Sequence, residues 1–339
     1  MARPVASTDT WRWAGSDLAG LTLSGAAFDG RRVQLAGADG RYAASGQATS
    51  PIWETGFPFD TAVLSWNADA PAGTSLKVEL RARTADGWSG WYAMGSWGPG
   101  GGSSVAGQAD RWGSVDVDTL ELKAKASALQ YRATLSTTDP RTTPSLRLVA
   151  VTYADRSRPL AGPKLASGPG LGRDLDVPRY SQLDQDPSIA WDMCSPTSLA
   201  MVLKFWGVGG SVLETARGVR DAATGIYGNW PLNTAYAGAR GLEAYVDRLY
   251  SVEQLEAEIA AGRPVIASVR WRAGELDNAP IASAEVGHLI VVRGFTSQGD
   301  VIVNDPVGRG EGIRRVYKRQ QLANVWLGQG GVVYLVRPR

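Results

Sequence analysis

Cysteine and histidine are nearly absent from this chain of 339 residues, which has one of each, Cys194 and His288. A single cysteine excludes an intrachain disulfide. One cysteine and one histidine also exclude a structural zinc site, because such a site takes about four Cys or His ligands. Thiol chemistry in this protein must therefore use Cys194, and a mechanism that needs an imidazole must use His288.

Long charged runs and long apolar runs are missing as well. The 35 basic and 33 acidic residues give a net charge of +2 without blocks of one sign, so we expect no nucleic acid partner. No apolar stretch approaches the ~18 residues of a membrane span, and the first residues lack the apolar core of a signal peptide. We expect a cytoplasmic protein, or a secreted or cell-envelope protein whose leader was removed.

Length and composition predict two globular domains. At about 100–200 residues per domain the chain has room for two, and 44% hydrophobic with 20% charged residues is an ordinary globular balance. We expect a multidomain fold with an all-β sandwich accessory domain at 1–155 and a linker at 156–175. An α+β domain follows at 176–339. The linker is rich in proline and glycine and has no hydrophobic periodicity.

Alternating apolar and polar residues carry the β prediction for the first domain. The alternation is found at 76–81, 120–123, 131–135 and 145–148, with turn signals between the runs. Regularly spaced short strands without helical periods are typical of a β-sandwich.

Aromatic residues are concentrated in this first domain. Eight of the 13 tryptophans precede residue 113, and Trp88, Trp91, Tyr92 and Trp97 cluster beside the glycine-rich run 98–102. Exposed rings on a sandwich can stack on sugars, which would make a cell-wall glycan a partner. The alternative, which we favour, is that these rings fill the core or the seam between the domains.

From residue 176 the pattern is mixed. A helical apolar face runs from Leu199 to Trp206, and Gly207 is a plausible stop. Capping boxes at Ser211 and Ser251 open two further helices, the second closed by Gly262. Strands are predicted at 264–269, 288–292, 301–303 and 332–336, with a turn at 297–299. Helices followed by a run of strands indicate an α+β domain.

Cys194 is expected at a helix N-terminus. It directly precedes Ser195 and Pro196, and proline suits the first helical turn because its missing N–H is not needed there. At that position the helix dipole and free N–H groups favour the reactive thiolate. The alternative is a buried, inert cysteine.

His288 begins an apolar strand, where a histidine is often only structural. If residues 297–299 close a hairpin, Asp305 lies roughly opposite residue 290 or 291, about 7–10 Å from His288 along the strands. A carboxylate there can hold the imidazole in one tautomer and stabilise its charged form. Asn304 is the rival, because adjacent strand residues face opposite ways and only one of the two can serve. Asp305 can also simply end its strand before Pro306.

A polar stretch before Cys194 contains a candidate oxyanion donor. The side chain of Gln182, together with the Cys194 backbone N–H, can stabilise a tetrahedral intermediate. Gln185 is the alternative donor. A third interpretation is that Gln182 is an ordinary loop residue with no role in catalysis.

The glycine runs 98–102 and 168–172 lack the context of a phosphate loop. The spacing of the acidic residues Asp184, Asp186 and Asp192 is not that of an EF-hand, so we expect no cofactor and no metal.

These segments resemble the bacteriocin-processing (double-glycine leader) peptidase-like family of bacterial papain-fold cysteine peptidases. The similarity covers about 176–339 and rests on 177–182, on Cys194 to Met201, on Gly287-His288 and on Asn304-Asp305-Pro306. It implies a papain-like cysteine peptidase with Cys194 as nucleophile, His288 as base, Asp305 as orienting residue and Gln182 in the oxyanion hole. Ser195 stands where the family has glycine.

Three functions follow from these observations. The first is a cysteine peptidase that hydrolyses a peptide or protein substrate through a thioester acyl-enzyme. The second keeps the acyl-enzyme but changes substrate or acceptor, as an amidase or acyltransferase does. The third is a catalytically silent protein that binds a glycan or another protein.

Overall fold

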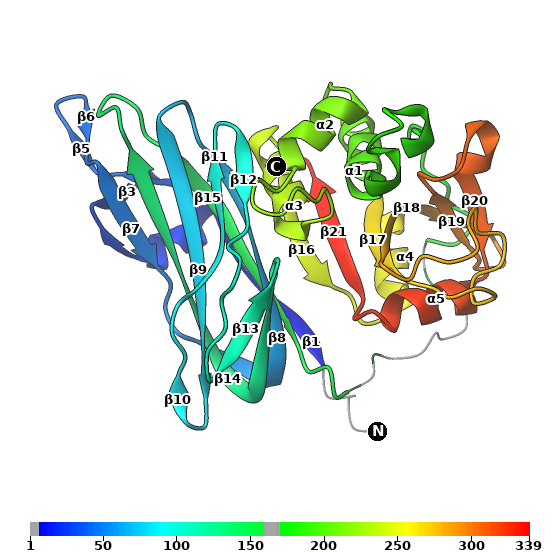
Figure 1. The fold of residues 1–339 in the computed structure, drawn as a ribbon, viewed down its shortest axis with the longest axis horizontal. Coiled ribbons are helices and arrows are strands. Elements are labelled where there is room, and N and C mark those ends of the chain that lie inside the picture. The colour runs from blue at the N-terminus through cyan, green and yellow to red at the C-terminus, as the bar shows by residue number, and fades with distance from the viewer. Residues whose placement is uncertain (1–6, 159, 161–167, 169) are drawn as a thin grey trace.

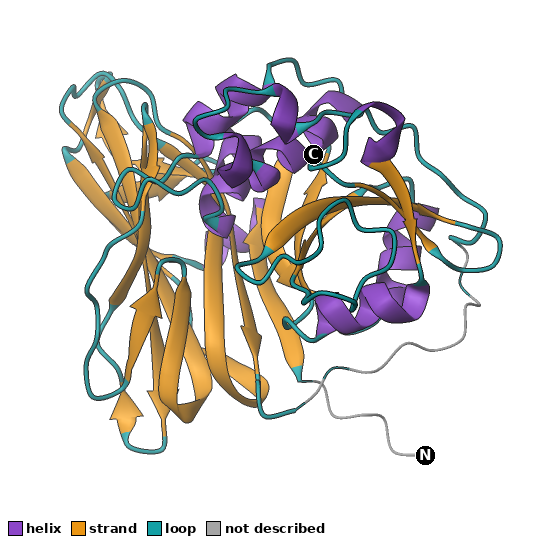
Figure 2. Ribbon diagram, turned by 45° about the vertical axis from the view of Figure 1, so that its right-hand side comes forward, coloured by secondary structure: helices purple, strands orange, loops and turns teal. Residues whose placement is uncertain are grey.

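The computed structural model describes residues 7–158, 160, 168 and 170–339, and its two halves differ in secondary structure (Figure 1). The N-terminal half is built from strands, and the C-terminal half packs helices against a second sheet (Figure 2). Both predictions of class, all-β first and mixed α and β second, are confirmed. The domain boundaries at 155 and 176 stay predictions, and most of the predicted linker, residues 159, 161–167 and 169, lies outside the described residues.

The N-terminal domain has one 3-10 turn, η1 (Gly15–Gly20), and fifteen strands in the described range: β1 (Thr8–Ala14), β2 (Thr22–Ser24), β3 (Ala26–Phe28), β4 (Val33–Leu35), β5 (Gly37–Ala38), β6 (Arg41–Tyr42), β7 (Ser45–Thr49), β8 (Trp53–Asp69), β9 (Thr74–Thr84), β10 (Gly87–Trp88), β11 (Tyr92–Gly98), β12 (Gly101–Ser103), β13 (Gly113–Asp116), β14 (Thr119–Thr137) and β15 (Ser145–Ala154). All except β5 and β6 belong to one 13-stranded hydrogen-bonded sheet.

Strand β14 organises this sheet. It contains both of the predicted runs 120–123 and 131–135, which are one continuous strand and not two. Its first part pairs with β8 and β13 and its second part with β9 and β7, and the register shifts at Ala126 and Ala128. An irregularity of this kind bends a strand and increases its twist, so the two ends of one long strand can pair with different neighbours.

The aromatic cluster of the N-terminal domain is largely packed. Tyr92 and Trp97 are buried in the core. Trp88 and Trp91 are half-buried, and the guanidinium of Arg81 lies 4.6 Å from the centre of each ring. Cation–π contacts with arginine therefore occupy ring faces that a sugar would need.

The C-terminal domain contains five helices and six strands among the described residues: α1 (Cys194–Phe205), α2 (Val212–Val219), α3 (Trp230–Ala239), α4 (Val252–Ala260), α5 (Arg319–Leu327), β16 (Glu243–Arg248), β17 (Val265–Val269), β18 (His288–Phe295), β19 (Val301–Asn304), β20 (Arg314–Tyr317) and β21 (Val332–Arg337), with 3-10 turns η2 (Gln182–Asp184), η3 (Ala190–Asp192) and η4 (Gly310–Ile313). The strands form one antiparallel sheet in the order β16-β21-β17-β18-β19-β20.

The predicted helices and strands of this domain are confirmed, with one local correction. Helix α1 ends before Gly207, whose φ of +78° suits glycine. Ser211 and Glu214 form the expected capping box of α2. Ser251 precedes α4 as predicted but its hydroxyl makes no capping bond. The box fails there because the Gln254 side chain accepts instead from the backbone N–H of Tyr250, at 2.7 Å.

The two domains meet along strand β16, the edge strand of the C-terminal sheet. Asn67 in β8 accepts from the backbone N–H of Ala244 at 3.0 Å and donates to the carbonyl of the same residue at 2.6 Å. Ser65 accepts from the N–H of Val246 at 3.1 Å. An uncovered edge offers free backbone groups to other chains, and here side chains of the N-terminal domain satisfy them.

Further polar contacts join the domains: an ion pair of Arg12 with Glu243, and hydrogen bonds from Arg147 to the carbonyl of Gly238 (2.8 Å), from the Ser104 N–H to Asp221 (3.0 Å) and from the Trp230 N–H to Asp118 (2.8 Å). The last bond places a carboxylate of the N-terminal domain at the first turn of α3, where the helix dipole favours negative charge. None of the helices in the described part of the chain is both long and apolar enough to cross a bilayer.

The hydrogen bonds of Asn67 to the β16 edge yield a stability prediction. Asn67→Ala leaves the buried N–H and carbonyl of Ala244 without partners, so we expect a loss of about 3 kcal/mol in the free energy of unfolding. Denaturant titration of the full chain measures it. Thr55→Ala, which removes one exposed hydrogen bond to the carbonyl of Ser127, is the control and should cost under about 0.5 kcal/mol. Equal losses in the two variants would contradict the role of Asn67.

Candidate active site

Cys194 is the first residue of α1, as its position before Pro196 predicts. Its side chain is partly exposed, whereas the rest of the first helical turns is buried. One turn further along, the Ser198 hydroxyl donates to the carbonyl of Leu289 in β18, at 2.9 Å. This buried hydrogen bond ties the start of the helix to the strand that begins with His288.

His288 opens β18 and is buried, with 3% of its surface exposed. Its Nε2 lies 2.8 Å from a carboxylate oxygen of Asp305, and its side chain is also hydrogen-bonded to that of Cys194. Because Nε2 faces the carboxylate, Nδ1 is the ring nitrogen left for the sulfur. The fold thus brings the sole cysteine and the sole histidine into contact.

Asp305 follows β19 and is fully buried. Asn304 pairs with Val291, so Asp305 lies opposite residue 290, within the range that the hairpin predicts. Its carboxylate accepts from the Tyr317 hydroxyl at 2.7 Å and from the backbone N–H of Val307 at 3.1 Å, in addition to His288. Three donors hold the carboxylate in place.

The pKa values of the buried pair move apart. Burial by itself lowers the pKa of His288, but the charge and hydrogen bond of Asp305 and the contact with Cys194 raise it above its usual value of 6.5. Burial raises the pKa of Asp305, yet the charge of His288 and the donors around it hold that pKa below 3.8. The arrangement favours an imidazolium beside an ionised carboxylate.

Asn304, the rival to Asp305, points elsewhere. Its amide nitrogen donates to the carbonyl of Pro178 at 3.0 Å, and its amide oxygen accepts from Arg293 at 3.2 Å. Adjacent strand residues face opposite sides, so Asn304 ties the segment before the helix to the sheet while Asp305 reaches the imidazole.

Gln182 is buried near the turn that precedes Cys194. Its amide nitrogen donates to the carbonyl of Ala190 at 2.8 Å, and its amide oxygen has no hydrogen-bond partner among the described residues. Gln185 is half-buried and donates to the carbonyl of Ser181 at 3.0 Å. Of the two, Gln182 is bonded to the η3 turn that leads into Cys194.

Ser195 is buried, and its hydroxyl lies 2.9 Å from the hydroxyl of Tyr334 in β21. The serine side chain therefore packs against β21, the neighbour of the edge strand β16. This contact accounts for the polar residue at a position where the resembling family has glycine.

Three residues of the site were not identified from the sequence. Trp271 meets the His288 ring edge to face, with the centres 5.6 Å apart, and is itself buried. Tyr317 donates to Asp305, and Ser198 ties α1 to β18. No sequence pattern marks them, because each comes from a segment that only the fold brings near His288.

The other motifs have structural roles in the described residues. Asp184 forms an ion pair with Arg309 at 2.7 Å, Asp186 accepts from the N–H of Ser188 at 2.9 Å, and Asp192 is exposed. The glycine-rich run 98–102 forms the turn between β11 and β12.

Comparison with family models divides the chain in two. Residues 174–334 match the model described as Peptidase_C39 like family, and residues 6–154 match the model described as Peptidase C39 N-terminal domain. The C-terminal half therefore contains a C39-like peptidase domain, preceded by a β-rich domain of its own family.

Similar solved structures include a putative C39-like peptidase from Bacillus anthracis, 18% identical over 50% of this chain and 98% of that one, with a TM-score of 0.39. A double glycine motif protease from an AMS/PCAT transporter, solved with the leader peptide, is 20% identical over 50% and 95%, with a TM-score of 0.33. An endo-1,4-beta-D-xylanase 10B from Clostridium thermocellum is 12% identical over 52% and 30%, with a TM-score of 0.18. These scores are too low to carry an argument. No curated protein matches the chain.

The buried pair yields a pH prediction. A raised His288 pKa contributes stability that is complete below about pH 6.5 and is lost as pH rises through the folded value. A lowered Asp305 pKa contributes stability that is complete above about pH 3.8 and is lost as pH falls through the folded value. Asp305→Asn should therefore cost about 2 kcal/mol between these limits, and less on either side.

Denaturant titrations across pH measure this difference in unfolding free energy. Asp277→Asn, which removes an exposed carboxylate paired with Lys318, is the matched control and should show almost no loss. A loss that does not vary with pH would mean that the His288–Asp305 contact carries no charge.

Proposed function

We propose that this cysteine-type peptidase, whose residues 174–334 form a C39-like peptidase domain, cleaves peptide bonds through Cys194, His288 and Asp305. One observation carries the assignment of residues. Cys194 begins a helix and is hydrogen-bonded to the single histidine, which in turn is bonded to a buried carboxylate. Acyl transfer requires a nucleophile, a base in contact with it, and a group that orients the base.

The chemistry follows from these contacts. His288 takes the thiol proton, and the thiolate of Cys194 attacks the carbonyl carbon of the peptide bond. The imidazolium then gives its proton to the leaving amine as the C–N bond breaks, which leaves a thioester. His288 next removes a proton from water, the hydroxide attacks the thioester, and the acid product leaves as the thiol forms again. Asp305 stabilises the imidazolium throughout.

The negatively charged oxygen of the tetrahedral intermediate needs hydrogen-bond donors. The backbone N–H of Cys194, at the start of α1, is one candidate, because the first N–H groups of a helix have no partner within it. Gln182 is the second. Its amide nitrogen has two hydrogens, and the Ala190 carbonyl takes only one of them.

The finer classification is part of the same proposal. The segments around 177–182, Cys194, His288 and Asp305 support a place in the bacteriocin-processing peptidase-like group, with a papain-like arrangement of helix and sheet. We also propose that the N-terminal domain is a β-sandwich accessory module, in which parts of the 13-stranded sheet pack face to face around the core.

Loss of the nucleophile tests the proposal. Cys194→Ala should reduce kcat/KM on a cleavable peptide by at least about 10⁴-fold, while the thermal unfolding midpoint changes little. The same assay, run with an amine acceptor and read by mass spectrometry, separates hydrolysis from acyl transfer. Peptidase activity that survives in Cys194→Ala would reject the mechanism.

Activation of the thiol is tested without a substrate. If His288 stabilises the thiolate, iodoacetamide should alkylate Cys194 at pH 6 at least about tenfold faster in the native protein than in His288→Ala. Mass spectrometry of the single cysteine gives the rate. Tyr42→Phe, which removes one hydroxyl from β6 in the N-terminal domain, is the control and should match the native protein. Equal rates in the native protein and His288→Ala would show an unactivated thiol.

A further inference from the structure

A cavity of about 750 Å³ lies between the two domains and is lined by residues of both. The N-terminal domain contributes the start of β14 and the segment after β15, including Arg156 and Arg158. The C-terminal domain contributes Trp230, Arg248 and Arg270, together with the end of α5 and the following turn. No residue proposed above for catalysis lines this cavity.

Arg248, on the cavity wall, stands at the end of the sheet where His288 lies. Arg248 ends β16 and pairs with Val332 at the start of β21, and Val269 ends β17 and pairs with His288 at the start of β18. Since β21 lies beside β17, Arg248 and His288 stand at the same end of four adjacent strands. Three strand spacings separate them, or about 14 Å.

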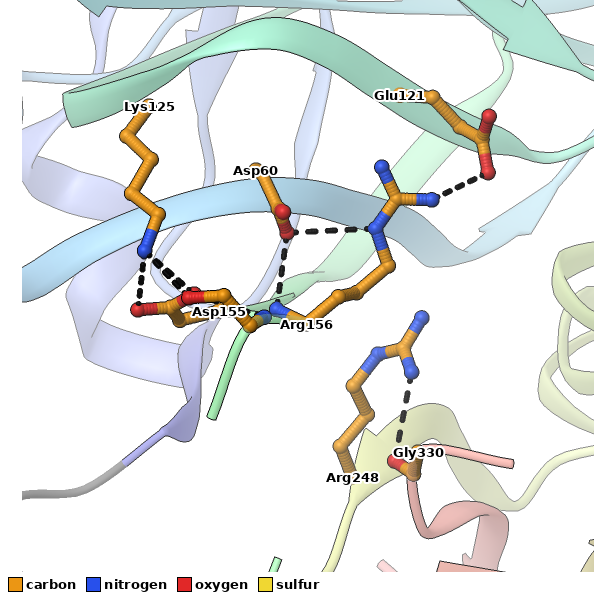
Figure 3. A network of polar contacts seen from close by, with 8 residues as sticks. Asp60, Glu121, Lys125, Asp155, Arg156, Arg248 and Gly330 are labelled. Atoms are coloured by element: carbon orange, nitrogen blue, oxygen red, sulfur yellow. Dashed lines mark hydrogen bonds and ion pairs between the residues drawn. The ribbon is translucent and has the colours of Figure 1, made fainter. Parts of the chain in front are cut away.

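Most charged groups around the cavity neutralise one another. Arg156 is paired with Asp60 at 3.4 Å and with Glu121 at 2.7 Å (Figure 3). Asp155 is paired with Lys125 at 2.8 Å and with Arg158 at 3.2 Å. These two networks need no further ion.

Arg248 is different. It is buried, with 8% of its surface exposed, and among the described residues it forms no ion pair. One of its terminal nitrogens donates to the carbonyl of Gly330 at 3.3 Å (Figure 3), and its Nε has no hydrogen-bond partner there. Burial lowers the pKa of Arg248 to about 10, so the guanidinium is still charged at neutral pH. The carboxylate of Asp118 acts on this charge without forming an ion pair, and a buried Nε–H that lacks a hydrogen bond is costly.

The groups around Arg248 leave its Nε without a partner among the described residues. Gly330 has a φ of +83°, and a Cβ there would lie 2.4 Å from the guanidinium. The nearby carboxylate of Asp118 is engaged by the Trp230 N–H and the Thr119 hydroxyl. Arg270 is exposed on the cavity wall, and its side chain has no ion pair in the described part of the chain. Asp116, also exposed, is the remaining acidic residue of the wall.

We propose that this cavity is a substrate subsite that binds a carboxylate of the peptide, with Arg248 as the anchor. The inference rests on the proposed peptidase function and deepens it. A guanidinium matches a carboxylate through two parallel hydrogen bonds, and Arg248 has the free Nε that such a pair uses. An extended peptide rises about 3.3 Å per residue. The separation of about 14 Å between Arg248 and His288 therefore places the acidic residue roughly four positions from the cleaved bond. The N-terminal domain thereby takes part in substrate selection.

The test compares matched peptides. In a fluorogenic peptide that the enzyme cleaves, Asp or Asn is placed in turn at each of several positions on both sides of the scissile bond. The native protein should prefer Asp by about tenfold in kcat/KM, mainly through KM, at a position roughly four residues away. Arg248→Met should abolish this preference, so that the variant cleaves the Asp and Asn peptides with equal kcat/KM.

Arg156→Met is the matched control, since Arg156 lines the same cavity but is already paired, and the preference should persist there. If Arg248→Met does not fold, as judged by its thermal unfolding midpoint, Arg270→Met replaces it and should weaken the preference. Calorimetry with Cys194→Ala gives a readout without catalysis, in which the Asp peptide should bind more tightly than the Asn peptide.

Two outcomes overturn the subsite: an absence of any Asp preference in the native protein, or a preference that survives in the arginine variant tested. The failure of the proposed function looks different. In that case the native protein cleaves neither peptide, and Cys194 is alkylated at the rate found in His288→Ala.

Discussion

The contact between Cys194 and His288 is the interaction on which the proposed chemistry depends. The two residues are 94 positions apart, so the geometry of the domain must create the contact. The Ser198 hydroxyl, bonded to the carbonyl of Leu289, fixes the first turns of α1 against β18. Asp305 then fixes the imidazole from the other side and is itself held by Tyr317 and a backbone N–H. His288 and Asp305 are both buried, so the charge on the imidazole is held by neighbouring protein groups rather than by water.

The N-terminal domain is part of this construction. Its β8 side chains satisfy the free edge of β16, and Asp118 caps the first turn of α3. An edge strand with unpaired backbone groups is a site of unwanted association, and this edge is covered within the chain. The same seam creates the cavity in which the buried Arg248 forms no ion pair with the described residues, so one surface serves both stability and the proposed recognition of substrate.

The aromatic residues show how burial separates two interpretations of one sequence feature. Tyr92 and Trp97 lie in the core, and Trp88 and Trp91 pack on Arg81, as the packing interpretation predicts. A cell-wall glycan partner therefore has less support from these four rings than their clustering in the sequence suggested. The function of the N-terminal domain is better approached through its contacts with the peptidase domain.

Much of this protein followed from local sequence patterns. The helix after Cys194, the α2 capping box, the hairpin turn at 297–299 and the four predicted strands of the second domain depend on short-range periodicity and turn chemistry. The family resemblance implied Asp305, but local patterns left Asn304 open, since the choice depends on which face of β19 meets His288. The roles of Trp271, Tyr317 and the buried Arg248 likewise emerged only from tertiary structure. Long-range packing decides which distant side chains share a buried space, and no local pattern encodes that.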